Sequence, residues 1–282
     1  MPLRTYEQLS NPFLNSEITY KFVMREKYSL NNFTVRLARD SDEVKAAQHL
    51  RYEVFINEMG ATSDLVDHES RLEIDKFDEY FDHLLLFDNN KLEKNMGVVG
   101  VYRLLPDYKL PTGARYYSQV EYNLEKLETS GRKIMELGRS CIHKSYRGGA
   151  ALTYLWSGIS DYVQRHGIEI LFGVASFPGT DTTKIAASLS LLHNKYLAPQ
   201  NLMVTAKPPN NQRMDLVDWN EVDRVQAMKQ IPPLIKAYLR IGGFVGKDAY
   251  IDQSFNTIDV CMLLDVKRAD LKRLSVYKKE NY

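Results

Sequence analysis

The feature that most constrains the fold is a predicted strand that runs through a glycine-rich turn directly into an amphipathic helix. The strand reads MELGRSCIH, the turn contains YRGG, and the helix AALTYLWSGISDYVQRHG ends at Gly167. Such a turn presents the N–H groups of the first helical turn, which commonly bind a phosphate. Clusters of strands that alternate with single helices are typical of a mixed sheet. The pattern therefore predicts an α/β protein with an anion site at this turn.

The other predicted elements continue this alternation. Residues 33–37 alternate between apolar and polar side chains and predict a strand, after which Asp40 or Ser41 caps a helix that ends at Gly60. Residues 61–82 are acidic and predict a loop. Further strands are predicted at HLLLFD, GVVGVYRLL, ILFGVAS and TIDVCMLLDV, and further helices at TTKIAASLSLLHNKYL and PPLIKAYLRIGG.

Composition limits the class of protein. Of the 282 residues, 44% are hydrophobic and 26% are charged, which is typical of a globular chain. The net charge of +1 gives no reason to expect nucleic acid as a partner, and Cys141 and Cys261 form neither a CxxC metal motif nor a disulfide framework. No segment predicts a membrane span or a secretory signal. We therefore expect a cytoplasmic protein with an N-terminal arm over 1–32, one domain over 33–265 and a basic tail over 266–282.

Several fragments together resemble one family. They are LRYEVFINEMGA, IDKFDEYFDHLLLFD, VVGVYRLLP, ELGRSCIH and LFGVASFPGTD, and they extend over about residues 33–265. In this order they are similar to the bacterial ornithine N-acyltransferases, enzymes with a GNAT-like fold that are related to acyl-homoserine-lactone synthases. The resemblance implies an α/β (α+β) fold with a mixed central sheet flanked by helices. It also implies transfer of a 3-hydroxyacyl chain from acyl carrier protein to the α-amine of ornithine, the first step of ornithine lipid synthesis.

The resemblance assigns five residues to substrate binding. Arg51 and Phe55 lie four residues apart on one predicted helix face, and Asp75, Asp78 and Arg103 match the acids and the arginine of the autoinducer-synthase signature. Phe55 would line the acyl or pantetheine channel, or pack in the core. The two arginines lie among apolar residues and need partners, because a buried charge requires one. The two acids would hold the cationic amines of ornithine, or belong to a solvated surface loop.

The sequence departs from the related signatures at two places. Position 61 is Ala where the autoinducer synthases carry Trp, which argues against homoserine-lactone synthesis. The turn Tyr146, Arg147, Gly148 and Gly149 is the expected donor loop, but Tyr146 stands where the GNAT loop carries Arg or Gln. This difference favours the phosphopantetheine arm of a carrier protein over coenzyme A. We accordingly expect acyl-phosphopantetheine as the donor, with no permanently bound cofactor.

Glu136 and Arg139 form the candidate catalytic pair. Amide formation requires a neutral amine, so a base near the acceptor must remove a proton from the ammonium group. Glu136, at the start of an apolar strand beside the donor loop, is the expected base. Arg139 would orient Glu136 or bind a carboxylate. The alternative is that both residues belong to a structural ion network. No spacing matches a metal site, and none is expected.

Two other readings share these observations. The same fold could acylate another amino acid or a signal precursor, or the chain could be a non-catalytic protein that binds an acyl carrier or a lipid. Acyl carrier protein and an amino acid are the expected partners in the enzyme reading. The basic tail would either contact anionic lipid at the inner face of the membrane or form a solvated helix end.

Overall fold

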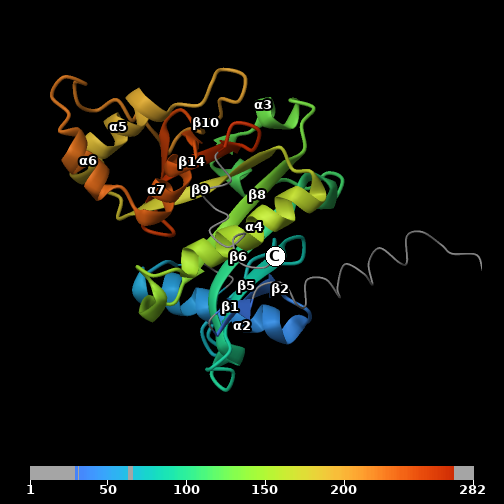
Figure 1. Cartoon of the computed structure of the whole chain (residues 1–282). Coiled ribbons are helices and arrows are strands. Elements are labelled where there is room, and N and C mark those ends of the chain that lie inside the picture. Colours follow the sequence, from blue (N-terminus) through green and yellow to red (C-terminus); the bar gives the residue numbers. More distant parts are fainter. Residues whose placement is uncertain (1–28, 31, 63–65, 270–282) are drawn as a thin grey trace, which may run out of the picture.

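The computed structural model describes residues 29–30, 32–62 and 66–269, and a long twisted sheet organises that part of the chain (Figure 1). Its strand order is β1-β2-β5-β6-β8-β9-β14-β13-β11, with β12 also paired to β14. Neighbouring strands are antiparallel except β8 and β9, which are parallel. The strands are β1 (Ser29–Leu30), β2 (Phe33–Leu37), β5 (Asp82–Asp88), β6 (Val98–Pro106), β8 (Ile134–Ile142), β9 (Ile170–Pro178), β11 (Asn211–Gln212), β12 (Phe244–Val245), β13 (Ala249–Asp252) and β14 (Thr257–Asp265).

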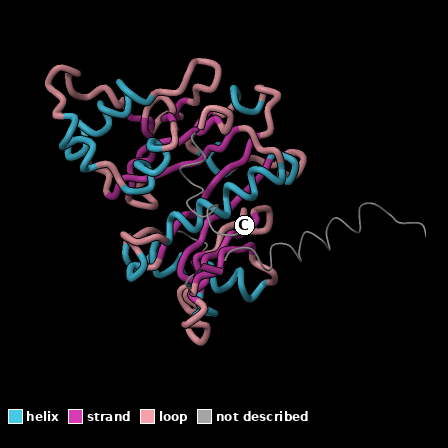
Figure 2. The backbone as a smooth tube through the Cα atoms, viewed as in Figure 1, coloured by secondary structure: helices cyan, strands magenta, loops and turns pink. Residues whose placement is uncertain are grey.

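Helices cover both faces of this sheet, and two short strand pairs lie outside it (Figure 2). The short pairs are β3 (Val66–Asp67) with β4 (Leu72–Glu73), and β7 (Tyr122–Asn123) with β10 (Thr205–Ala206). The α-helices are α2 (Ser41–Arg51), α3 (Glu125–Glu128), α4 (Ala151–His166), α5 (Ala186–Tyr196), α6 (Arg224–Gln230) and α7 (Pro233–Arg240). A π-helix, η1 (Tyr52–Glu58), continues α2, and a 3-10 turn, η4 (Tyr117–Val120), precedes β7.

Strand β5 shows why both faces need helices. Successive side chains of a strand point to opposite faces. Leu84 and Leu86 accordingly pack in the cluster that includes α4, whereas Leu85 and Phe87 pack in the cluster that includes α2. The apolar run HLLLF is therefore buried on both sides, as in a central strand.

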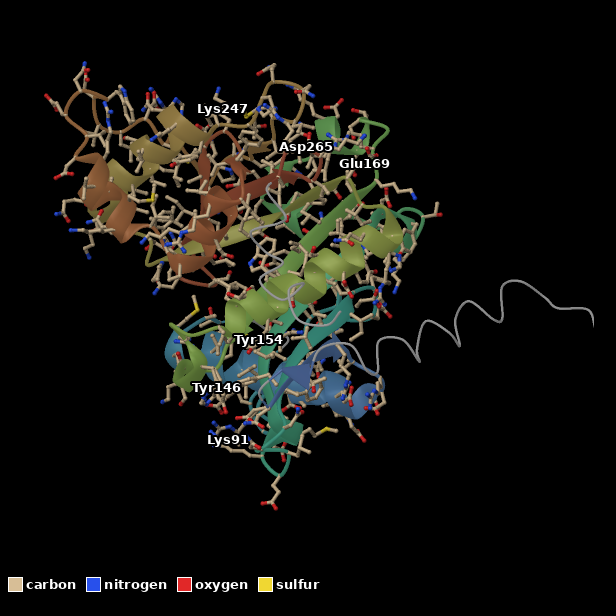
Figure 3. The ribbon with its side chains drawn as sticks, in the orientation of Figure 1. Lys91, Tyr146, Tyr154, Glu169, Lys247 and Asp265 are labelled. Atoms are coloured by element: carbon tan, nitrogen blue, oxygen red, sulfur yellow. The ribbon has the colours of Figure 1, made fainter. Side chains whose placement is uncertain are left out.

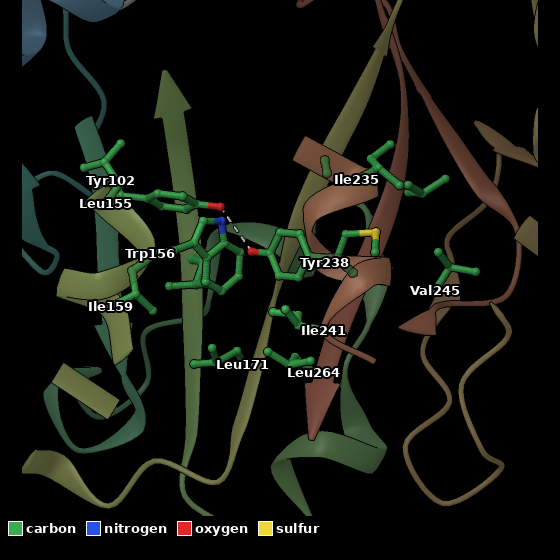
Figure 4. Packing of buried hydrophobic residues seen from close by; sticks show 14 of the residues in the cluster. Tyr102, Leu155, Trp156, Ile159, Leu171, Ile235, Tyr238, Ile241, Val245 and Leu264 are labelled. Carbon is green, nitrogen blue, oxygen red and sulfur yellow. Dashed lines mark hydrogen bonds between the residues drawn. The ribbon is translucent and has the colours of Figure 1, made fainter. Parts of the chain in front are cut away.

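The larger core joins α4 to α7 across the centre of the sheet (Figure 4). Trp156 on α4 packs edge-on against Tyr238 on α7 with ring centroids 4.8 Å apart. The hydroxyls of Tyr238 and Tyr102 lie 3.2 Å apart and are hydrogen-bonded, so neither buried phenol lacks a partner. These contacts fix the C-terminal half of the sheet to the N-terminal half.

Strands β8 and β9 separate after three residue pairs. They pair from Ile134 with Ile170 to Glu136 with Phe172, and no further pairs follow. Next in β9 is Gly173, where an added Cβ would lie only 2.1 Å from the carbonyl oxygen of Leu137. Only glycine permits this close approach at the point where the strands diverge. The opening between the two strands is the central feature of the fold.

The sequence predicted most of these elements. The predicted strands correspond to β2, β5, β6, β8, β9 and β14, and the predicted helices to α2, α4, α5 and α7. Asp40 caps α2 by accepting hydrogen bonds from the N–H groups of Asp42 and Glu43. The predicted first helix is α-helical only to Arg51 and then widens into η1, a feature often found at functional sites.

The predicted arm and tail lie largely outside the described residues. Residues 29–30, at the end of the expected arm, add β1 to the sheet edge beside β2. Residues 266–269 are described beyond β14, and the rest of the expected tail is not. The boundaries at residues 32 and 265 stay predictions. Within the described part of the chain, no helix has the length and apolar character needed to cross a bilayer.

Candidate active site

A cavity of about 400 Å³ opens where β8 and β9 separate. Both strands contribute to its walls, with η1 and η4, the turn before α4, the start of α7 and the β13–β14 connection completing them. Of the residues singled out in the sequence, those that line it are Phe55, Glu136, Arg139, Tyr146, Arg147, Gly148 and Gly149. The cavity therefore joins the expected donor loop to the expected catalytic pair.

The donor loop is held at one end of the cavity by its own side chains. The Tyr146 hydroxyl donates to Oδ2 of Asp88 at 2.6 Å, and Figure 3 places Tyr146 toward the end of the sheet that also carries Lys91. Arg147 lies 2.8 Å from the Glu58 carboxylate and donates to the carbonyl of Ile142 at 2.9 Å. The first-turn N–H groups of α4 follow directly, and these have no intrahelical acceptor.

Six charged residues form one buried group, here called the paired network: Arg51, Glu73, Asp75, Asp78, Arg103 and Arg139. Arg51 binds both Glu73 and Asp78, the latter at 2.6 Å. Nη1 of Arg103 lies 2.7 Å from oxygens of both Asp75 and Asp78. Three guanidiniums thus face three carboxylates, which is how a protein tolerates buried charge.

Burial and pairing act in opposite directions on these carboxylates. Burial alone would raise the pKa of Asp78, but Arg51 and Arg103 outweigh it and hold the pKa below its ordinary value. Burial is likewise outweighed at Glu73, chiefly by Arg139 and Arg51. Asp75 and Asp78 therefore direct their negative charge to arginines of the chain. Neither acid is among the described residues that line the cavity.

Arg139 connects the paired network to the cavity wall. Its backbone has a φ of +48° within β8, a left-handed conformation that is uncommon for a residue with a side chain. The guanidinium lies between two aromatic rings, 4.6 Å from the centroid of Tyr117 and 4.8 Å from that of Phe255. It lies 3.1 Å from Glu73 and 3.0 Å from Asp75. These contacts are those of the alternative, a structural ion network, and the two predicted roles of Arg139 in catalysis stay predictions.

Glu136 is buried in the wall of the cavity, with 1% of its surface exposed. Its carboxylate accepts hydrogen bonds from the N–H groups of Tyr117 at 2.9 Å and Ser118 at 2.6 Å, and from the Ser118 hydroxyl. Burial raises the pKa of Glu136, and the bonds from Ser118 and Tyr117 offset only part of this effect. Glu136 therefore anchors the start of η4, and its assignment as base stays a prediction.

The sequence did not predict a second group of acids, which consists of Glu121, Asp252 and Asp259. It is here called the unpaired acid cluster. One carboxylate oxygen from each lies within 4.8 Å of the others, and all three residues line the cavity. Glu121 and Asp259 are each 3% exposed, and Oε2 of Glu121 and Oδ1 of Asp259 accept no hydrogen bond from the described residues. This geometry suits a cation, either a metal ion or an ammonium group.

Burial and mutual repulsion raise the pKa values of this cluster. Burial raises the pKa of Asp259 to about 7 together with the nearby Asp252 carboxylate, and a hydrogen bond from Ser176 offsets only part of this effect. Burial and the carboxylates of Asp259 and Asp252 raise the pKa of Glu121 well above its ordinary value. Glu121 directly follows η4, and Asp252 and Asp259 lie on β13 and β14, so no local motif contains all three acids. The available signal was Asp259 itself, an acid within the apolar run TIDVCMLLD.

The chain is similar to known acyltransferases. Residues 50–157 match the family model described as an acetyltransferase (GNAT) domain. The L-ornithine N(alpha)-acyltransferase of Rhodobacter capsulatus is 48% identical, covering 87% of this chain and 95% of that protein. The protein of that name from Brucella abortus is 35% identical, covering 89% and 90%.

Among solved structures, a CoA-dependent acyl-homoserine lactone synthase aligns with a TM-score of 0.45 and 14% identity, covering 83% of this chain and 81% of that one. The sheet with its parallel β8–β9 pair flanked by helices is the GNAT-like fold expected from the sequence. With the identity and coverage found for the curated relatives, the chain belongs to the L-ornithine N(alpha)-acyltransferase family and is an acyltransferase.

Proposed function

We propose that this acyltransferase moves an acyl chain from the phosphopantetheine thioester of acyl carrier protein to the α-amine of ornithine, as the first step of ornithine lipid synthesis. The observation that carries the proposal is the cavity between β8 and β9, because it extends from the donor loop to Glu136 and the unpaired acid cluster. The names of the two curated relatives support ornithine as the acceptor. The chain's own residues supply the chemistry, with no resident cofactor.

The donor end of the cavity suits a phosphopantetheine arm. Beyond Glu136, none of the described strands pairs with β8 on its β9 side, so the peptide groups that face this side are available to an extended amide-containing chain. The turn from Tyr146 to Gly149 lies at the cavity wall and leads into α4, where a phosphate would meet free N–H groups. Arg147 already pairs with Glu58, so part of the positive charge at this turn is neutralised within the chain.

The reaction itself needs a proton acceptor and a donor to the developing oxyanion. The amine nitrogen bonds to the thioester carbon, the C–S bond breaks, and the thiol leaves with a proton. Glu136, whose pKa is raised by burial, would accept the proton from the α-ammonium directly or through a water. N–H groups of β8 beyond Glu136 that face the β9 side would stabilise the oxyanion.

The test is product mass after incubation of the purified protein with 3-hydroxyacyl-carrier protein and a mixture of amino acids. We expect N-acylornithine as the product, with a rate that falls by about 100-fold or more in Glu136→Gln. Glu93→Gln, at an exposed position, is the matched control and should leave the rate unchanged.

Two outcomes would contradict the proposal in different ways. A conjugate of another amino acid, or of a signal precursor, would keep the reaction and replace the acceptor. Binding of the acyl carrier without any product would replace the enzyme reading with that of a carrier- or lipid-binding protein.

The proposal also includes a cytoplasmic site of action with peripheral contact at the inner membrane face, because the product carries a long acyl chain. Co-sedimentation with anionic vesicles, compared with neutral ones, tests this part separately.

A further inference from the structure

We propose that the unpaired acid cluster is the acceptor subsite, in which Glu121, Asp252 and Asp259 bind the side-chain ammonium of a diamino acid and so select a cationic acceptor. The inference rests on the proposed function, since it names the part of the cavity that distinguishes ornithine from neutral amino acids. It concerns one residue just after η4 and one each on β13 and β14, none of which belongs to the sequence motifs that carry the family resemblance.

The first argument is that the cluster is incomplete without a ligand. Oε2 of Glu121 and Oδ1 of Asp259 are buried and accept no hydrogen bond from the described residues. Leaving a buried acceptor unsatisfied costs stability, so such groups generally have a protein or ligand partner. Both side chains line the cavity, where a ligand can reach them.

The second argument is the sign of the missing charge. Arg139 is a cation that lowers the pKa values of both Glu121 and Asp259. That guanidinium already pairs with Glu73 and Asp75. The cluster therefore has carboxylates in excess, and a cation is the ligand that would balance them.

The third argument favours an ammonium group over a metal ion. An ammonium offers three N–H donors, one for each carboxylate of the cluster. Asp252 already accepts N–H bonds from Ser254 at 2.7 Å and Phe255 at 3.0 Å, so one of its two oxygens is engaged. The adjoining wall includes Val174 and the ring of Phe255, which suit a methylene chain better than the water ligands of a hydrated metal ion.

The fourth argument is the position of the cluster relative to Glu136. Glu136 binds the first residues of η4, Tyr117 and Ser118, whereas Glu121 follows the last residue of the same turn. The proposed base and the proposed ammonium subsite therefore lie at opposite ends of one short rigid element. The proposal places the α-amine of the diamino acid toward Glu136 and its side-chain nitrogen in the cluster.

The experiment compares two acceptors that differ only in the side-chain nitrogen. L-Norvaline has the carbon chain of L-ornithine without the terminal amine. We expect the preference for ornithine over norvaline, measured as the ratio of kcat/KM values with the same acyl-carrier protein, to fall by about 100-fold in Glu121→Gln and in Asp259→Asn. The rate with norvaline should be unchanged or higher in these variants.

The matched control is Asp265→Asn on the same strand as Asp259. Asp265 pairs with Arg132 at 2.8 Å, outside the cavity-lining residues, and its loss should leave the preference for ornithine unchanged. Glutamine and asparagine retain the shapes of the acids they replace, and the melting temperature of each variant checks that it is folded. Asp252→Asn serves as a further variant if either of the others fails to fold.

The outcomes separate this inference from the proposed function. Wild-type enzyme that acylates norvaline as efficiently as ornithine, or folded variants that keep the wild-type preference, would overturn the subsite and leave the function standing. A wild-type enzyme that acylates only a neutral amino acid would overturn both. Calorimetric binding of Mn²⁺ that the variants lose, together with ornithine acylation that EDTA abolishes, would overturn the ammonium assignment in favour of a metal.

Discussion

The paired network and the unpaired acid cluster place equal numbers of carboxylates in different surroundings. Each contains three carboxylates, and Arg139 acts on both groups. In the paired network, three guanidiniums lower the pKa values of Glu73, Asp75 and Asp78 despite burial. In the cluster, burial dominates and the pKa values of Glu121 and Asp259 are raised.

Under the proposal above, this difference separates a group that stabilises the fold from one that binds a ligand. A carboxylate paired within the chain contributes to the folded state and cannot also bind a substrate cation without losing its partner. A buried carboxylate without a partner destabilises the folded protein in the absence of substrate. Such a loss of stability is often found where function requires it. Asp75 and Asp78, the acids that the sequence suggested for ornithine, are paired in this way, and their role in ornithine binding stays a prediction. Glu121 and Asp259 line the cavity, and one carboxylate oxygen of each accepts no hydrogen bond from the described residues.

The largest expected effect is the loss of a cation from the paired network. Arg103→Met leaves Asp75 and Asp78 buried without their shared partner, so the free energy of unfolding should fall by about 3–5 kcal/mol. Guanidinium chloride titration measures it. Arg71→Met, which breaks an exposed pair with Glu53, is the control and should cost less than about 1 kcal/mol. Equal losses of unfolding free energy in the two variants would contradict the claim that the buried pairs contribute more to stability than the exposed pair.

A smaller loss is expected when the charge of Arg139 is kept and its shape is changed. In Arg139→Lys a single ammonium cannot serve both Glu73 and Asp75, and the stacking between the two rings is lost. The free energy of unfolding should fall by about 2 kcal/mol, as for one lost charged hydrogen bond. Arg213→Lys, at an exposed pair, is the matched control. Unchanged stability in Arg139→Lys would show that charge alone is required at this position.

The unpaired acid cluster should respond in the opposite direction. Because burial raises the pKa of Asp259 to about 7 in the folded protein, its proton is held more tightly than in the unfolded chain. The stability that this proton provides is complete below the unfolded pKa of about 4 and is lost as the pH rises toward 7. Asp259→Asn removes this loss, so the variant should be more stable than wild type by about 1–4 kcal/mol at pH values near 8.

Thermal unfolding over about pH 4 to pH 8 measures the effect. The advantage of Asp259→Asn should grow with pH and shrink when L-ornithine is added to the wild type, since a bound ammonium would stabilise the ionised acid. An advantage that is constant over this range would mean that Asp259 does not titrate there, and the contrast with the paired network would fail.

The sequence predicted the elements of the fold better than the surroundings of its charges. Alternation and turn residues located the main strands and helices, because these patterns are local. Separate motifs contributed Arg51, Asp75, Asp78, Arg103 and Arg139 to one predicted site, and the structure brings their charges together. Which acids are neutralised depends on partners far away in the chain, such as Glu73 with Arg139. No spacing in the sequence reveals those partners.

The unpaired acid cluster also could not be predicted from sequence patterns, because Glu121 lies far away in the chain from Asp252 and Asp259. Glu121, Asp252 and Asp259 come from three separate elements and meet only because β13 and β14 pair beside η4. An acid within the apolar strand TIDVCMLLD was visible, but the strand also contains Asp265, whose carboxylate is paired. The sequence offers no way to tell these two aspartates apart.

The smallest expected change in stability comes from Asp265, which can be compared with Asp259 on the same strand. Arg132 binds Asp265 with two hydrogen bonds of 2.8 and 2.9 Å, and the arginine lowers the pKa of the carboxyl. Figure 3 shows Asp265 near Glu169, toward the end of the sheet away from Tyr146. The pair is partly exposed, so Asp265→Asn should lower the free energy of unfolding by only about 1 kcal/mol near neutral pH.

The pH dependence of that loss should have the opposite sign to that of Asp259. A carboxyl with a lowered pKa stabilises the folded protein above its unfolded pKa, and this contribution disappears as the pH falls through the folded value. The differences in unfolding free energy between wild type and each of the two variants, Asp265→Asn and Asp259→Asn, should therefore both vanish in acid. At higher pH they should have opposite signs. At neutral pH, Asp265→Asn would then destabilise the chain, and Asp259→Asn on the same strand would stabilise it. If both substitutions destabilised, the carboxylate of Asp259 would have a partner in the folded protein, and the cavity would have no excess negative charge for a substrate to neutralise.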